Sequence, residues 1–228
     1  MEKRFSNIVL NIPHASKIIP INTWESSIDM MLHEWTDTKT DELFKGEFLQ
    51  VKSVVFPVSR FFCDFERLVD DPLEEQGQGI FYTKFDKAVR KKDKGVYDYA
   101  MTLYNNHKAF INSFINEGTL LIDCHSFPSH VAPNTDICIG FNEDWSKPSQ
   151  ELIDKVVNHF LSYGFNVDIN NPYSNSITPK DSKDYKSLMI EVNKRNYLTP
   201  EGFLSNRGYE LKSLINYLYK NILFRWNY

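Results

Sequence analysis

The sequence has few cysteines and no excess of positive charge. Its three cysteines, Cys63, Cys124 and Cys138, show no Cys-x-x-Cys spacing and cannot all pair. This pattern favours reduced thiols packed in the core of a cytoplasmic protein over a disulfide scaffold. The formal net charge of −4 provides no positive field for nucleic acid. We interpret the one basic run, at 90–94, as solvated.

Long apolar runs are also absent. The apolar run near the N-terminus, at 8–10, is interrupted by Asn11 and Pro13 and is too short for a signal sequence or a membrane span. Hydrophobic residues make up 42% and charged residues 25%, as in ordinary globular proteins. No internal repeat, low-complexity tract or linker is present. We therefore expect one domain spanning residues 1–228, with no membrane or nucleic-acid partner.

Short apolar, β-branched runs alternate with stretches of helical period. The runs that predict strands are 8–12, 51–58, 120–122, 137–140 and 188–193. The predicted helices are about 28–44, 97–116, 149–163 and 200–219, and the predicted long loops are 70–79 and 170–182. This alternation predicts an α/β fold, a three-layer sandwich with a largely parallel mixed sheet flanked by helices. Ligands of such sheets bind beyond the carboxyl ends of the strands.

Two histidines follow predicted strands. His14 comes directly after Pro13, and His125 lies in the segment 123–126. A lone histidine at such a place can simply cap a loop, but two at equivalent edges of one sheet favour metal ligands. Imidazole suits zinc, and a catalytic zinc has three protein ligands, so a carboxylate should complete the set with Zn²⁺ or another divalent metal.

Asp37 and Asp41 are the predicted sources of that carboxylate. Their spacing of four residues places both on one face of the predicted helix. One could bind the metal while the other orients a ligand. The alternatives are a solvated acidic helix face, or Asp37 as a helix N-cap.

Glu191 stands within the predicted strand 188–193, where an unpaired buried carboxylate would cost several kcal/mol of desolvation. A carboxylate beside a metal-activated water is the usual general base of a metallohydrolase. The alternative is a structural ion pair with Arg195 or a lysine. Arg60 and Arg67 flank an aromatic-rich stretch, and either can grip an acidic substrate or pair with Asp64 or Glu66.

The ordered set of segments resembles the N-formylglutamate amidohydrolase family, which is similar in turn to the zinc carboxypeptidase and succinylglutamate desuccinylase group. The matching motifs are Pro-His-Ser/Ala-Gly at 11–16, Asp-x-x-x-Asp-x-Leu-Tyr at 37–44, Arg…Asp-x-Asn-Arg at 59–67, Tyr-x-x-Tyr-His at 104–107, Asp-x-His-Ser at 123–126 and Glu-x-Asn-Arg-x-x-Tyr at 191–197. No single motif is specific, but six in this order are.

The resemblance implies roles for individual residues. The implied metal ligands are His14 and His125 with Asp37 or Asp41, and the implied catalytic residues are Glu191 and Arg67. The implied substrate-binding residues are Arg60, His107, Ser126, Asn193 and Arg195. Four positions depart from the family motifs: Ser16 replaces glycine, Glu66 replaces the asparagine of Asp-x-Asn-Arg, and Asn175 and Ser176 stand where glycines are common.

These features predict a zinc-dependent amide hydrolase for a small N-acylated acidic amino acid such as N-formylglutamate. Glu191 would assist the attack of metal-activated water on the amide carbonyl. Two alternatives remain: a zinc peptidase or deacylase acting on another N-acyl amino acid or peptide, and a non-catalytic binding domain of the same fold. The departures at Glu66 and at 175–176 bear on the substrate rather than on the metal chemistry.

Overall fold

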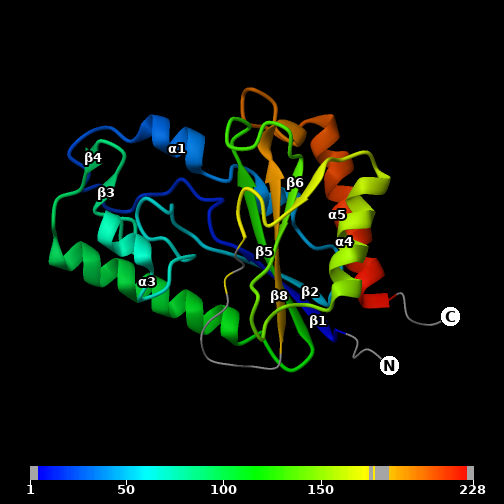
Figure 1. The fold of residues 1–228 in the computed structure, drawn as a ribbon. Helices are drawn as coiled ribbons and strands as arrows, with labels where there is room; N and C mark the ends of the chain where they lie inside the picture. Colours follow the sequence, from blue (N-terminus) through cyan, green and yellow to red (C-terminus); the bar gives the residue numbers. More distant parts are fainter. Residues whose placement is uncertain (1–4, 175–176, 178–184, 225–228) are drawn as a thin grey trace. The chain divides into compact units, whose positions relative to one another are not determined.

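The structure, a computed structural model, describes residues 5–174, 177 and 185–224 of the chain. It divides into two compact units (Figure 1). Unit 1 comprises Met1–Ile12, Lys39–Val54 and Phe114–Tyr228, and unit 2 comprises Pro13–Thr38 and Val55–Ser113. Two predictions concern residues outside the described part of the chain. They are the departure from the family motif at 175–176 and most of the long loop at 170–182.

Unit 1 carries a six-stranded sheet with strand order β2-β1-β5-β8-β6-β7. Its strands are β1 (Asn7–Ile12), β2 (Val51–Val55), β5 (Thr119–Phe127), β6 (Ile137–Gly140), β7 (Val167–Ile169) and β8 (Lys186–Asn193). β1 pairs with β5, and β5 with β8, in parallel, whereas β6 runs antiparallel to β8. The predicted α/β fold with a largely parallel mixed sheet flanked by helices is confirmed.

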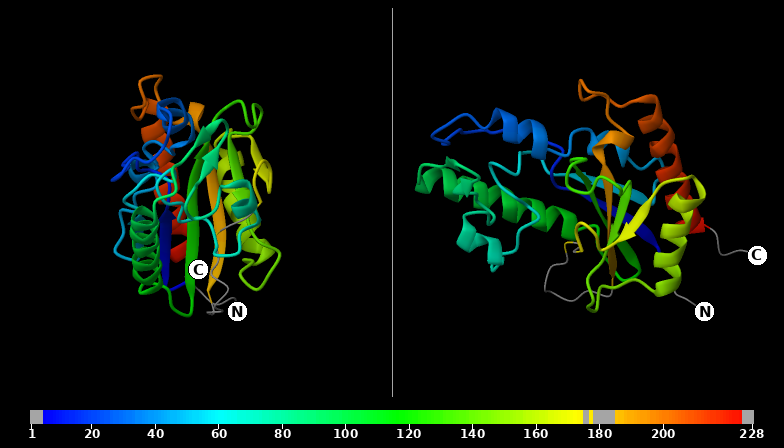
Figure 2. Two further views of the ribbon diagram at one scale, coloured as in Figure 1. Left: turned by 90° about the vertical axis from the view of Figure 1, so that its left-hand side faces the viewer. Right: turned by 45° about the horizontal axis from the view of Figure 1, so that its top comes forward.

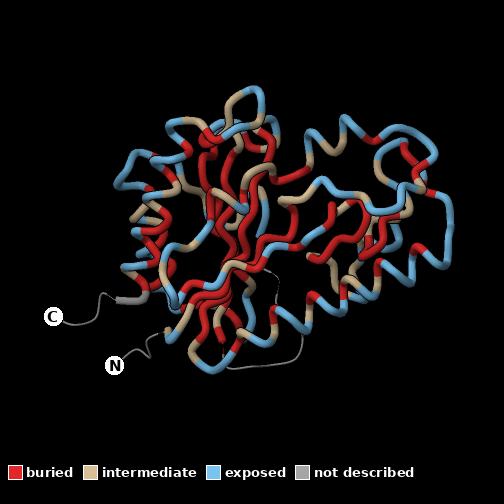
Figure 3. Tube along the Cα trace, turned by 180° about the vertical axis from the view of Figure 1, so that it is seen from behind, coloured by how far each residue is buried: buried red, intermediate tan, exposed pale blue. Residues whose placement is uncertain are grey.

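The three central strands carry most of their buried polar side chains on one face. In-register neighbours of a parallel pair share a face, and successive residues of a strand alternate between faces. Pairing Asn11 with Asp123, and His125 with Glu191, therefore collects these four polar side chains on one face. All four are buried, and Figure 3 shows the central strands in the colour of buried residues.

Two helices of unit 1 pack against the sheet. α4 (Gln150–Ser162) contacts β6 and β7, and α5 (Asn206–Phe224) contacts β1 and the short helix α2 (Thr40–Leu43). Figures 1 and 2 show α4 and α5 side by side. Nε2 of His159 in α4 lies 3.0 Å from the carbonyl oxygen of Leu214 in α5. Ser149 begins α4 as its N-cap, accepting a hydrogen bond from the N–H of Leu152. The prediction of a helix over 149–163 is confirmed.

Unit 2 contains α1 (Asp29–Trp35), the 3₁₀ helix η1 (Pro72–Gln76), the two-stranded β3 (Lys84–Phe85) and β4 (Ala88–Val89), and α3 (Lys94–Asn112). Its core is aromatic, with Trp24, Phe61 and Tyr82 buried together. Arg90 is also buried, and its guanidinium lies 3.7 Å from the centre of the Phe81 ring. The interpretation of 90–94 as a wholly solvated run is therefore wrong at Arg90.

The predicted helix 28–44 is wrong as a single element. α1 ends at Trp35, Thr36 takes an extended conformation, and Lys39 adopts a left-handed backbone with φ 67° before α2 begins. Asp37 therefore lies between two helices and is buried, whereas Asp41 lies in α2 and is exposed. The two carboxylates do not share one helix face.

Other boundaries differ less. α5 begins at Asn206 rather than near 200, because residues 198–205 form a turn closed by the Leu198–Leu204 bridge. The predicted loop 70–79 contains η1, which begins at the N-cap Asp71. All three cysteines are buried and free, as expected. Among the helices of the described residues, none has the length and apolar character needed to cross a membrane.

Candidate active site

The polar cluster of unit 2 is built around the fully buried carboxylate of Asp64. Its Oδ1 lies 2.7 Å from Nε2 of His14 and accepts a 3.0 Å hydrogen bond from the N–H of Glu66. Its Oδ2 accepts hydrogen bonds from Arg60 at 3.1 Å and from the Tyr82 hydroxyl at 2.6 Å. By distance alone His14, Asp64 and Glu66 could hold a metal, since their ligand atoms lie within 4.8 Å of one another. The four contacts already use the acceptor sites of Asp64. Asp64 therefore anchors these four neighbours.

Electrostatics keep this carboxylate ionised. Burial works to raise the pKa of Asp64, but the neighbouring His14 and Arg60 outweigh it and hold the pKa well below its ordinary value. Burial also raises the pKa of the Tyr82 hydroxyl, which therefore stays protonated and donates its hydrogen bond at neutral pH.

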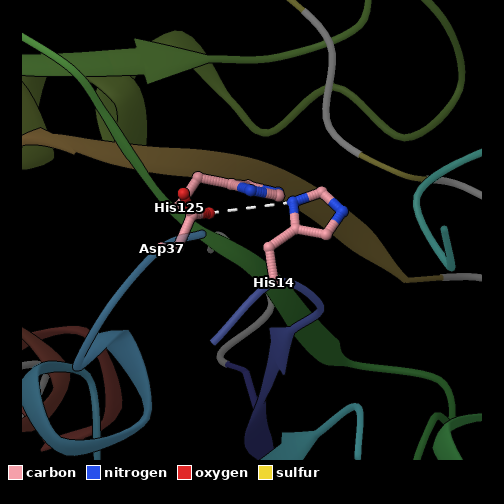
Figure 4. A group of neighbouring side chains, drawn as sticks. All are labelled: His14, Asp37 and His125. Carbon is pink, nitrogen blue, oxygen red and sulfur yellow. Dashed lines mark ion pairs between the residues drawn. The ribbon is translucent and has the colours of Figure 1, made fainter. Parts of the chain in front are cut away.

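His14 and Asp37 also meet within unit 2. Nδ1 of His14 lies 3.7 Å from Oδ2 of Asp37 (Figure 4). The N–H of Asp37 also donates a 3.0 Å hydrogen bond to the carbonyl oxygen of His14. The side-chain separation is too long for a hydrogen bond. Two atoms bound to one tetrahedral zinc lie about 3.4 Å apart, given metal–ligand distances of about 2.1 Å. The pair therefore suits two ligands of one metal.

Arg60 and Arg67 both belong to this cluster but differ in their contacts. Arg60 also lies 3.6 Å from Glu66, in addition to its hydrogen bond with Asp64. Nε of Arg67 lies 3.8 Å from Asp64 and donates no hydrogen bond to a described residue. The predicted alternative, pairing with Asp64 or Glu66, is thus seen in full for Arg60 and only weakly for Arg67.

His107, in α3, is held by aromatic rings. Its ring packs edge-on against Phe65 at 4.4 Å and Phe56 at 4.8 Å between centroids. Burial lowers its pKa to about 4, so the ring is neutral at physiological pH. Phe65 stands between Asp64 and Glu66, and His107 therefore supports the segment that carries the acidic side chains.

The polar cluster of unit 1 follows a similar plan. Nε2 of His125 lies 3.3 Å from Oδ1 of Asp123. The same oxygen accepts a 2.7 Å hydrogen bond from Asn11, and Oδ2 accepts one from the N–H of Ile177 at 3.0 Å. Burial opposes the charge of Asp123, but His125 and these hydrogen bonds lower its pKa. Each predicted histidine ligand therefore lies beside a buried aspartate of its own unit.

Glu191 is the in-register neighbour of His125 on one side and of Cys138 on the other, and it is 6% exposed. Arg195 forms an ion pair with Asp136, with 2.9 Å between Nη2 and Oδ1. The alternative pairing of Glu191 with Arg195 is therefore not formed.

Two other predicted residues of unit 1 have different surroundings. The amide of Asn193 donates hydrogen bonds to the carbonyls of Ala132 and Thr135 and accepts one from Ser129, so it holds the 129–135 loop. Ser126 follows His125 in β5, so its side chain lies on the opposite face of the sheet.

The chain was also compared with known proteins. The family model described as N-formylglutamate amidohydrolase matches residues 6–198, which is most of the sequence. The chain belongs to the N-formylglutamate amidohydrolase family. No curated protein matches it by sequence. The family resemblance drawn from the six ordered motifs is confirmed.

Solved structures share the fold of this family member. The N-formylglutamate amidohydrolase from Ralstonia eutropha JMP134 superposes with a TM-score of 0.80 at 16% identity, over 97% of this chain and 94% of that one. A gene product from Agrobacterium tumefaciens has a TM-score of 0.67 at 19% identity, over 95% of this chain and 88% of that one. These likenesses show the fold.

Four residues of this family member that build the clusters were not predicted as site residues: Asn11, Asp64, Tyr82 and Asp123. A usable signal existed for the two aspartates. Asp64 stands among Phe61-Phe62-Cys63 and Phe65, and Asp123 directly follows Leu120-Leu121-Ile122. A lone carboxylate in an apolar run needs compensation, which is the argument that singled out Glu191.

Proposed function

We propose that this protein is a metal-dependent hydrolase that cleaves the amide bond of a small N-acyl amino acid. The family supports amide hydrolysis of an N-acyl amino acid. The observation that carries the metal is the His14–Asp64 hydrogen bond of 2.7 Å, because it occupies Nε2 and leaves Nδ1 as the atom placed to bind an ion beside Asp37. Metal-binding histidines commonly donate their second ring N–H to a carboxylate in this way.

The proposed ligands are His14 and Asp37 of unit 2 and His125 of unit 1, the set that the family motifs imply; their side chains are drawn in Figure 4. Two buried imidazoles and a buried carboxylate are a donor set that suits zinc. His14 follows the end of β1 by two residues. His125 lies in β5, which is the parallel neighbour of β1. It follows Asp123, the residue paired with Asn11 of β1, by two residues. Asp41 is exposed, so the buried Asp37 is the preferred carboxylate of the two candidates.

A bound divalent metal would lower the pKa of a coordinated water and polarise the amide carbonyl. Glu191 takes the proton of the attacking water and returns it to the leaving nitrogen. Burial suits this role, because the low-dielectric surroundings strengthen proton transfer at a positioned carboxylate. Asp64 keeps the ring of His14 in one orientation through its hydrogen bond with Nε2, and Asp123 lies beside the ring of His125.

Arg67 binds the α-carboxylate that an N-acyl amino acid carries. The side chain of Arg67 is 18% exposed, and its Nε lies 3.8 Å from Asp64 without a hydrogen bond, so its guanidinium donors can receive a carboxylate in bidentate geometry. Arg60 and His107 remain candidates for substrate contact, whereas Ser126 lies on the face of the sheet opposite His125. Asn193 and Arg195 already hold the segment 129–136, so they act on the site by positioning it.

The test combines metal content and activity. Purified protein, loaded with zinc and dialysed, is analysed for bound metal and assayed against a panel of N-formyl, N-acetyl and N-succinyl amino acids. We expect about one equivalent of metal and hydrolysis of at least one substrate class. His14→Ala and His125→Ala should each lose the metal and the activity. A protein that binds no divalent metal and hydrolyses none of the panel is the non-catalytic binding domain instead.

A further inference from the structure

We propose that Glu66 determines substrate specificity and directs the enzyme toward N-acyl amino acids with one carboxylate, whose side chain is neutral or basic, and away from acidic ones such as N-formylglutamate. This inference rests on the proposed function and names its substrate class. It is carried by the contacts of the two arginines and two carboxylates of the Asp64 cluster in unit 2.

The cluster has a buried and a partly exposed layer. Asp64 and Tyr82 are almost wholly buried. The side chains of Arg60, Arg67 and Glu66 are 15%, 18% and 22% exposed. A bound ligand would therefore meet the two guanidinium groups and the Glu66 carboxylate, and not Asp64.

The charges of the exposed layer decide what it can bind. Arg60 donates a hydrogen bond to Asp64 and lies 3.6 Å from Glu66, so two carboxylates of the protein already compensate it. Asp64 and, more weakly, Glu66 stabilise the charge of Arg67, but its Nε lies 3.8 Å from Asp64 and donates no hydrogen bond to a described residue. The cluster can therefore receive one further carboxylate, at Arg67.

A second substrate carboxylate would lie beside the negatively charged Glu66 and not beside a second arginine able to bind it. Like charges brought together in a partly desolvated site repel strongly, and interfaces use such repulsion to reject wrong partners. A neutral amide offers N–H donors to Glu66, and an ammonium group offers a charge of opposite sign. The same carboxylate that repels glutamate thus favours glutamine or lysine at the side-chain position.

The experiment compares two substrates of equal size and shape. kcat/KM is measured for N-formylglutamine and N-formylglutamate with the zinc-loaded parent protein, with Glu66→Gln, and with Glu75→Gln. Glu75 is exposed in η1 of the same unit, so this control makes the same charge change away from the cluster. The ratio of two substrates on one variant cancels any change in metal content or folded fraction.

We expect the parent to prefer N-formylglutamine by roughly 10- to 100-fold, Glu66→Gln to reduce that preference by about 10-fold or more, and Glu75→Gln to keep it. The change should appear mainly in the KM of the glutamate substrate. A parent that prefers N-formylglutamate, or a ratio unchanged by Glu66→Gln, overturns this inference while leaving the proposed function intact. Failure of the parent to hydrolyse any N-acyl amino acid overturns the proposed function itself.

Discussion

Nε2 of His14 lies 2.7 Å from Oδ1 of Asp64, and this contact fixes which ring nitrogen of His14 faces Asp37. A carboxylate in this position also raises the basicity of the ring. Loss of such a partner typically lowers metal affinity by 10- to 100-fold. In the proposed metal site, Asp64 would therefore act on the metal through the ring of His14.

Asp64→Asn should weaken metal binding by about 10- to 100-fold, measured by competition with a chromophoric chelator. Tyr82→Phe is the matched control, because it removes another hydrogen bond to the same carboxylate and leaves His14 in place. That variant should lose stability by about 1 to 3 kcal/mol, since a buried acceptor loses its donor, and keep near-parental metal affinity. Equal metal affinity in the parent and Asp64→Asn would contradict the orienting role.

Asp37→Asn and Asp41→Asn test the choice between the two candidate carboxylate ligands. Asp37 is buried beside His14, whereas Asp41 is exposed in α2. We expect Asp37→Asn to strip most of the metal, because a neutral amide is a poor zinc ligand. Asp41→Asn should retain it. Plasma emission analysis of dialysed protein measures the bound metal of each variant. Loss of metal from Asp41→Asn and not from Asp37→Asn would assign the ligand role to Asp41.

Glu191→Gln should lower kcat by about 10² to 10⁴ while metal content and melting temperature stay near the parent values. The amide fills the same space but cannot accept the proton. Glu143→Gln, an exposed change in the same unit, controls for loss of charge. If Glu191→Gln instead melts earlier and keeps full specific activity in its folded fraction, Glu191 is structural.

Arg67→Lys should raise KM for a free-carboxylate substrate by about 10- to 100-fold, a loss of roughly 1.5 to 3 kcal/mol for a charged hydrogen bond. The matching amide of the α-carboxyl group should be affected much less, because it forms no ion pair with the guanidinium. Steady-state kinetics on both substrates measure this. An unchanged ratio of acid to amide hydrolysis in the variant would remove Arg67 from the substrate site.

Hydrophobic pattern predicted the fold well because the strand cores are nearly pure apolar runs. β5 shows where this reasoning stops. Its apolar run ends at Ile122, but hydrogen bonding with β8 carries the strand on through Asp123 and His125 to Phe127. Partner strands can stabilise polar residues that a local pattern assigns to a loop.

The site was harder to predict than the fold. Helical spacing paired Asp37 with Asp41, but the left-handed backbone at Lys39 separates them, and no local signal at a lysine announces that conformation. The contact of His14 with Asp64 joins residues 50 positions apart. Such a contact depends on the packing of 55–65 against 13–18, which no short motif encodes.

Finally, His107 should make the protein less stable in mild acid. Its pKa falls from 6.5 to about 4 in the folded state because burial penalises the charged ring. Below pH 6.5 the unfolded chain binds a proton that the folded chain does not, so stability falls as pH drops from about 6.5 toward 4. His107→Phe keeps the contacts with Phe56 and Phe65 but cannot titrate. Relative to that variant, the parent should lose roughly 2 kcal/mol of unfolding free energy between pH 7.5 and pH 5. Urea denaturation at both pH values measures the difference, and parallel pH profiles for the two proteins would show that the pKa of His107 is the same in the folded and unfolded states.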